Sequence, residues 1–135
     1  MVFADGSRVS TKNGVGAVRM LEPLKIGQIT DGTSNTLLLS EKRMNVSRLG
    51  QMQANDNEGY TCGWNHDIVR FASRAPRPDF RHPSDHGDDR FGSSHPGGLN
   101  IALCDASVRF LAFDVELEIF KRLGCRMDGY PVHGQ

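Results

Sequence analysis

The chain has 135 residues, enough for one domain over 1–135 whose core buries roughly two-thirds of the surface that the unfolded chain exposes. Its 16 Lys and Arg balance 16 Asp and Glu, so no basic field is present to hold a nucleic-acid backbone, and nucleic acid is excluded as an expected partner. No run approaches the roughly 18 apolar residues of a membrane span, so we expect no membrane contact by the chain as given.

Short apolar runs separated by 15 glycines predict strands joined by turns. The first strand is predicted at 37–39, a run of three leucines that follows the turn at Asp31-Gly32. A short aromatic strand is predicted around 60–64. Residues 72–96 contain four of the six prolines and few apolar side chains, which predicts a long irregular excursion.

The stretch SSHPGGLNIALCDASVRFLAF, residues 93–113, predicts a β-hairpin with Asp105-Ala106 as a two-residue loop. In that register the opposite residues on one face are all apolar: Leu103 with Val108, Ile101 with Phe110, and Leu99 with Ala112. We expect this face to be buried, so that Phe110→Ala costs about 3–5 kcal/mol. His95 then opens the hairpin and Asp105 forms an Asx-type turn about 30 Å away, so the two cannot form a pair within one chain.

A short helix is predicted after the hairpin, with Asp114 as its cap and Gly124 at its end. Its apolar residues fall on one side: Val115, Ile119, Phe120 and Leu123. The elements together predict an α+β domain, in which a mainly antiparallel twisted sheet ends in a C-terminal β-hairpin and a short helix.

Four stretches of the chain, in order, resemble a large bacterial family of prepilin-like proteins of unknown function. They are NGVG from Asn13, ITDGTSNTLLLSEK from Ile29, the His95-to-Asp105 spacing of nine residues, and RLGCRMDGYPV from Arg122. The resemblance implies a fold like the globular head of a pseudopilin. It also implies a non-enzymatic structural or interaction role in a pilin-like assembly, at an extracytoplasmic or cell-surface location.

The chain departs from this family pattern in two ways. The family carries glycine after the turn aspartate, where this chain has Ala106, so we expect the turn to shift and Ser107 to take the positive φ. Family members begin with a prepilin leader and a long apolar helix, neither of which is in the chain as given, so the resemblance covers the head alone. A chain whose natural start is Met1 is expected to be cytoplasmic.

A head without that helix is expected to leave apolar sheet residues uncovered. The candidates are the apolar residues of the predicted hairpin face together with the leucines at 37–39. Large apolar patches usually mark an interface, so we expect self-association, most simply a twofold dimer, or contact with other pilin-like subunits.

The turn containing Asp31, Gly32 and Asn35 is rich in oxygen ligands. An EF-hand is excluded because Lys42 occupies the position where its bidentate glutamate is required. Two interpretations stay open, a turn whose side chains cap their own backbone and a calcium site completed from elsewhere. No cofactor is certain, and calcium or another divalent metal is the candidate.

A second candidate metal site lies in the excursion, and its ligand types suit a metal-dependent hydrolase as an alternative function. Its residues are Asp79, His82, Asp85, His86 and Asp89, with Asp88 and His95 close in sequence. Their spacing matches no metal motif, and arginines among them favour a solvated, salt-bridged loop instead. No Gly-x-Ser-x-Gly motif is present, so no catalytic residue is assigned.

Two further residue sets leave alternatives open. Tyr60 and Trp64 are either core residues or the stacking platform of a carbohydrate-binding module. The three cysteines lack a C-x-x-C pair, which leaves either separate reduced thiols or one disulfide between Cys62 and Cys125.

Overall fold

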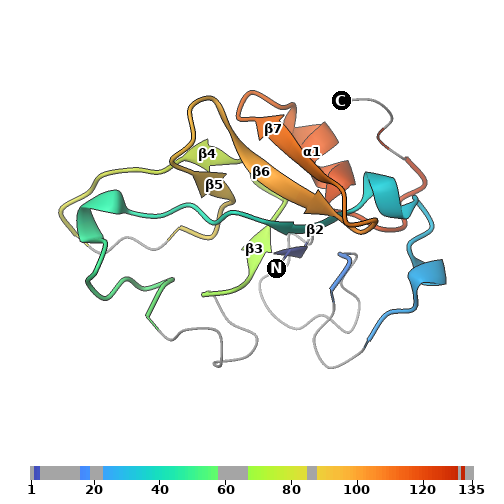
Figure 1. The fold of residues 1–135 in the computed structure, drawn as a ribbon, viewed down its shortest axis with the longest axis horizontal. Coiled ribbons are helices and arrows are strands. Elements are labelled where there is room, and N and C mark those ends of the chain that lie inside the picture. Colours follow the sequence, from blue (N-terminus) through green and yellow to red (C-terminus); the bar gives the residue numbers. More distant parts are fainter. Residues whose placement is uncertain are drawn as a thin grey trace.

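The computed structural model describes residues 2–3, 16–18, 23–57, 67–84, 88–130 and 132. Within these ranges the chain forms the predicted α+β domain, built on a three-stranded antiparallel sheet in the order β2-β6-β7 (Figure 1). These elements are β2 (Leu37–Ser40), β6 (Gly98–Leu103), β7 (Val108–Ala112) and the helix α1 (Leu117–Leu123). No helix in the described ranges has the length and apolar character needed to cross a membrane.

Smaller elements surround this sheet. Two parallel pairs are formed by β1 (Val2–Phe3) with β3 (Arg70–Phe71) and by β4 (Arg77–Pro78) with β5 (Gly92–Ser93). Single turns of 3-10 helix occur at Ile26–Gln28, Thr33–Asn35 and Val46–Arg48. The predicted excursion at 72–96 therefore contains two short strands, and the predicted strand at 60–64 lies outside the described residues.

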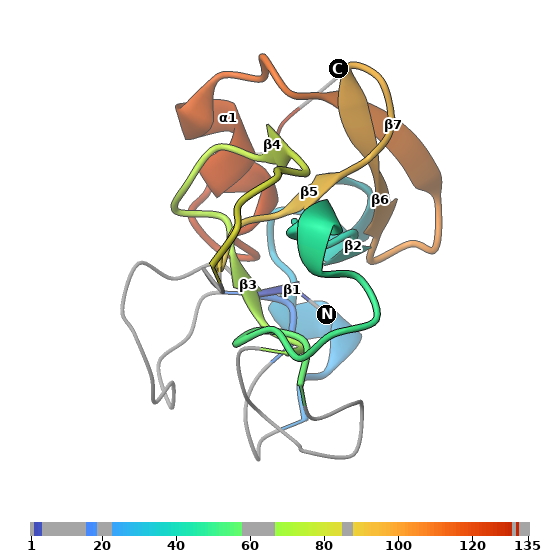
Figure 2. The ribbon, with the colours of Figure 1, turned by 90° about the vertical axis from the view of Figure 1, so that its left-hand side faces the viewer.

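The core fills the space between the sheet and α1. Figure 2 shows α1 and β4 on the same side of β6 and β7. Phe91, which precedes β5, and Phe120 of α1 meet edge to face with ring centroids 5.7 Å apart. The other core residues are Leu37, Ala72, Leu99, Ile101, Leu103, Leu111 and Leu123. One helix and one loop thus cover one face of the sheet, which we call the inner face.

The predicted hairpin is present, but its register differs by one residue. Opposite residues are Ile101 with Arg109 and Leu99 with Leu111, rather than Ile101 with Phe110. A one-residue change in register moves every side chain of one strand to the other face. The buried β6 residues are as predicted, whereas the faces of β7 are exchanged.

The turn explains the change of register. Ala106 itself adopts the left-handed conformation, with φ 68°, and its N–H donates to the carbonyl of Leu103 at 3.0 Å. The N–H of Leu103 donates in turn to the carbonyl of Ser107 at 2.9 Å, which gives a three-residue loop at 104–106. The expectation that Ser107 would take the positive φ is therefore wrong.

The exchanged faces overturn part of the predicted core. Val108 and Phe110, expected to be buried, are 69% and 57% exposed, while Leu111 is buried. The expectation that Leu99, Ile101 and Leu103 would stay uncovered is also wrong. These residues lie on the inner face, where α1 and Phe91 pack against the sheet.

The helix begins later than predicted. Its N-cap is Glu116, which makes no side-chain capping hydrogen bond, so the prediction of Asp114 as the cap is wrong. The N–H of Val115 donates to the carbonyl of Ala112 at 3.3 Å, which holds this segment in a turn before the helix starts. Gly124 stands at the C-cap, as predicted.

Candidate functional site

His95 and Asp105 lie at opposite ends of β6, as the hairpin prediction required. At the Asp105 end, the carboxylate accepts hydrogen bonds from the N–H of Ser107 at 2.9 Å and from its hydroxyl at 2.6 Å. These bonds confirm the predicted Asx-type turn, and they hold the pKa of Asp105 below its usual value.

The hairpin turn rests on the turn that precedes β2. The N–H groups of Cys104 and Asp105 donate to the carbonyls of Thr36 and Thr33, at 2.9 and 3.1 Å. The hairpin turn at Asp105 is thus hydrogen-bonded to the DGTSNT turn at residues 31–36.

At the His95 end of β6, the Glu41 side chain contacts both the His95 ring and the strand backbone. Its Oε1 lies 3.1 Å from Nε2 of His95, and its Oε2 accepts the N–H of Asn100 at 2.7 Å. The hydroxyl of Ser40 donates to the carbonyl of Asn100 at 2.8 Å. Because β2 ends at Ser40, these two side chains satisfy backbone groups of β6 that a longer β2 would have paired.

Glu41 was not predicted as a site residue, although its position in the SEK stretch directly after the leucine run is a usable signal. The side chains of Glu41 and His95 are partly exposed, and the Asn100 amide nitrogen lies 3.1 Å from the His95 ring. The group is a solvent-accessible carboxylate–imidazole pair whose observed contacts join three backbone segments.

The side chains of the Asp31 turn bond to backbone groups of the chain. The buried Asp31 carboxylate accepts the N–H groups of Asp128 and Gly129 at 2.7 and 3.0 Å. Asn35 caps its own turn by donating to the Asp31 carbonyl at 2.9 Å, and Gly32 supplies a positive φ of 95°. Asp31 therefore caps a turn 97 residues along the chain, in the RLGCRMDGYPV stretch, rather than its own.

Asp31 also belongs to the one group of three metal-type ligands found among the described residues. With Cys125 and Asp128 it places one donor atom each within 4.8 Å of one another. Both oxygens of Asp31 already accept backbone N–H groups, and burial raises the pKa of the free Cys125 thiol, which disfavours the thiolate that a metal needs. The calcium hypothesis gains no support from this geometry.

The Asp/His-rich segment has separate partners for its described members. Asp79 accepts the N–H of Met44 at 2.7 Å and the hydroxyl of Ser94 at 2.6 Å. Asp89 pairs with Arg74 at 2.9 Å.

In the same segment Asp88 pairs with Arg43 and Arg90, and His82 Nδ1 lies 2.9 Å from the Ser84 hydroxyl. Asp85 and His86 lie outside the described residues, as do Tyr60 and Trp64. The metal-dependent hydrolase and the carbohydrate module stay predictions.

The sheet face opposite the core, which we call the outer face, carries exposed apolar side chains. Leu39, Val108 and Phe110 are exposed there, Ala102 is partly buried, and the exposed polar Asn100 pairs with Phe110 on the same face. Leu39 pairs with Ala102 after a bulge that turns Leu37 inward, and Ala102 pairs with Val108. The Phe110 ring lies over Gly98, where an added Cβ would come within 2.7 Å of the ring and 2.2 Å of the Leu111 carbonyl.

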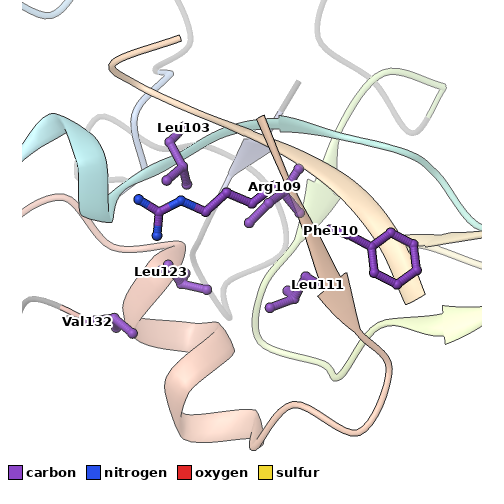
Figure 3. Close-up of a pocket in the computed structure, with 7 residues that line it drawn as sticks. Leu103, Arg109, Phe110, Leu111, Leu123 and Val132 are labelled. Atoms are coloured by element: carbon purple, nitrogen blue, oxygen red, sulfur yellow. The ribbon is translucent and has the colours of Figure 1, made fainter. Parts of the chain in front are cut away.

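The inner face has a small, shallow pocket, open in part to solvent, between β7, α1 and Val132 (Figure 3). Its walls are Ile101, Leu103, Arg109, Phe110, Leu111, Leu123 and Val132. Figure 3 shows the long Arg109 side chain extending across it, while the Phe110 ring points away from Leu123 and Val132. Apart from Arg109 the walls are apolar, and this arrangement has no acid–base pair.

These features define an α+β domain in which both ends of β6 are hydrogen-bonded to the segments that flank β2. The model of the family described as "Protein of unknown function (DUF1559)" matches residues 3–118, and the chain belongs to this family. No curated protein and no solved structure matches the chain.

Proposed function

We propose that this chain is a non-enzymatic interaction module of a pilin-like assembly at the cell surface. The observation that carries the proposal is the outer face, where Val108 and Phe110 of β7 are more than half exposed and Leu39, on the other side of β6, is 43% exposed. Contiguous apolar patches on a protein surface often mark an interface with a partner. The partner is a second copy or another pilin-like subunit.

The contacts of the motif residues also favour an interaction role over catalysis. The carboxylates of Asp31 and Glu41 accept backbone N–H groups from distant segments, and that of Asp105 accepts the N–H of Ser107 in its own turn. A general base or nucleophile has to reach a substrate, whereas both oxygens of Asp31 and one oxygen of Glu41 are bonded to the chain's own backbone.

The proposal is tested in the native organism with a photo-crosslinking residue in place of Val108. We expect crosslinks to the same chain or to other pilin-like subunits, recovered in the surface fraction released by shearing. Ile26, which is exposed but distant in sequence from the outer face, gives the matched control position and should crosslink much less. Recovery of the protein only from the cytoplasm, without crosslinks from position 108, would contradict the proposal.

A further inference from the structure

Strand β7 is an open edge of the central sheet, because its neighbour in the sheet is β6 alone among the described strands. Natural proteins usually protect such edges with charges, prolines or bulges. β7 reads VRFLA, and its only charged side chain, Arg109, extends across the inner pocket. Arg109 is therefore the one charge on this edge, and its side chain lies over the inner face, while Val108 and Phe110 are exposed on the outer face.

The backbone of this edge has groups available for another strand. In the hairpin, the pairs Leu103–Ser107 and Gly97–Phe113 are joined by hydrogen bonds of 2.9 Å. Since hydrogen-bonded and non-bonded pairs alternate in an antiparallel ladder, Val108 and Phe110 belong to non-bonded pairs. Their N–H and C=O groups point away from β6, toward the open edge.

The side-chain pattern of β7 fits a second copy of itself. Antiparallel pairing about a twofold axis at Phe110 sets Phe110 beside the same residue of the other copy, and Val108 opposite Ala112. Arg109 then lies opposite Leu111. The register shifted by one pair, centred on Arg109, would set two guanidinium groups against each other, and like charges directly opposite are destabilising.

We propose that two copies of this chain associate through their β7 edges in the register centred on Phe110, which joins two three-stranded sheets into one of six strands. The inference rests on the proposed interaction role and names its partner. A five-residue strand pair buries less than the roughly 800 Å² per partner of a standard interface, so the dimer is weak, with dissociation in the micromolar range. Such a contact suits a module that gains strength from several contacts in an assembly.

Cysteine crosslinking of the purified chain tests the register. In a background with Cys62, Cys104 and Cys125 changed to serine, Phe110→Cys places two thiols in a directly opposed pair about 5.5 Å apart between Cα atoms, within disulfide reach. Val108→Cys is the matched control, because its two copies would lie about 13 Å apart along the strands. We expect Phe110→Cys to form disulfide dimers at least about tenfold faster.

A second pair of variants makes the test independent of one substitution. Val108→Cys combined with Ala112→Cys should restore crosslinking, because these positions oppose each other across the axis. Val108→Pro should abolish the dimer in sedimentation while the monomer stays folded by circular dichroism, because its N–H faces the edge and not β6.

Equal crosslinking rates for Phe110→Cys and Val108→Cys, or a folded protein that stays monomeric at high micromolar concentration, would overturn the β7 dimer. Crosslinks from cells to a different pilin-like subunit, with a monomeric purified chain, would retain the proposed function and reject this partner. Loss of the surface location would reject the function without bearing on the β7 register.

Discussion

A single carboxylate, that of Glu41, holds both the His95 ring and the backbone of Asn100, through oxygens 3.1 and 2.7 Å from their partners. Glu41 directly follows β2, which ends at Ser40. Its carboxylate accepts the N–H of Asn100 in β6, a group that a longer β2 would have paired. The His95 end and the Asp105 end of β6 are thereby both fastened to segments that flank β2.

Replacing Glu41 tests this clamp. Glu41→Gln keeps the shape but weakens the charge-assisted bond to the backbone, and we expect the free energy of unfolding to fall by about 1 kcal/mol in urea titration. His95→Ala should cost less, because partly exposed ion pairs contribute about 0–1 kcal/mol. Glu118→Gln, on the exposed face of α1, is the control and should stay within about 0.5 kcal/mol. An unchanged Glu41→Gln protein would argue against the clamp.

Replacing two phenylalanines, Phe120 and Phe110, distinguishes the observed register of β7 from the predicted one. Phe120 is fully buried against Phe91, so Phe120→Ala should lower the free energy of unfolding by about 3–5 kcal/mol. Phe110 is 57% exposed in the monomer, so Phe110→Ala should cost only about 1 kcal/mol rather than the 3–5 first expected. Denaturant unfolding at dilute, monomeric concentration measures both, and equal losses would restore the predicted register.

The hairpin turn contains a residue that glycine would serve better. Ala106 adopts φ 68°, a conformation that costs a residue with a Cβ roughly 1–2 kcal/mol. We expect Ala106→Gly to raise the melting temperature and the free energy of unfolding by about 1 kcal/mol. Ala112→Gly, in the extended strand β7, is the matched control and should be destabilising by about 0.5–1 kcal/mol. Destabilisation by Ala106→Gly would contradict the assigned turn.

The buried Asp31 carboxylate should matter for stability without any metal. Asp31→Asn removes one of two oxygen acceptors and leaves a backbone N–H of the 128–129 turn unsatisfied, so we expect a loss of about 1–3 kcal/mol. Chelation with EDTA should leave the melting temperature of the unmodified protein unchanged. A clear fall on chelation, reversed by calcium, would instead favour the calcium hypothesis.

The Cys104 thiol gives a pH-dependent signal. Partial burial, followed by the charge of Asp105, raises its pKa from about 9 to about 11, so the folded state holds the proton more tightly than the unfolded chain does. This contribution to stability is complete below pH 9 and is lost as the pH rises through about 11. In a variant with Cys62→Ser and Cys125→Ser, the alkylation rate of Cys104 should rise with a midpoint near pH 11 in the folded protein. In urea the midpoint should lie near pH 9. A folded midpoint near 9 would contradict the assignment.

The sequence alone determined the class of fold, the hairpin and the separation of His95 from Asp105. Alternating Leu99, Ile101 and Leu103 can bury one face of a strand, and this local pattern needs no distant partner to be recognised. The short amphipathic helix followed from the same reasoning, with an error at its start because Glu116 rather than Asp114 precedes the first turn.

Only the tertiary structure decided the register of β7 and the partners of the motif residues. β7 has apolar residues on both faces, so its pattern fits either register, and the choice rests on Ala106 taking a positive φ that sequence reasoning assigned to Ser107. Asp31 and Glu41 contact residues 97 and 59 positions away, and no local spacing encodes contacts of that length. The fold brings β2 beside β6, and the chain's own helix covers the inner face of the sheet.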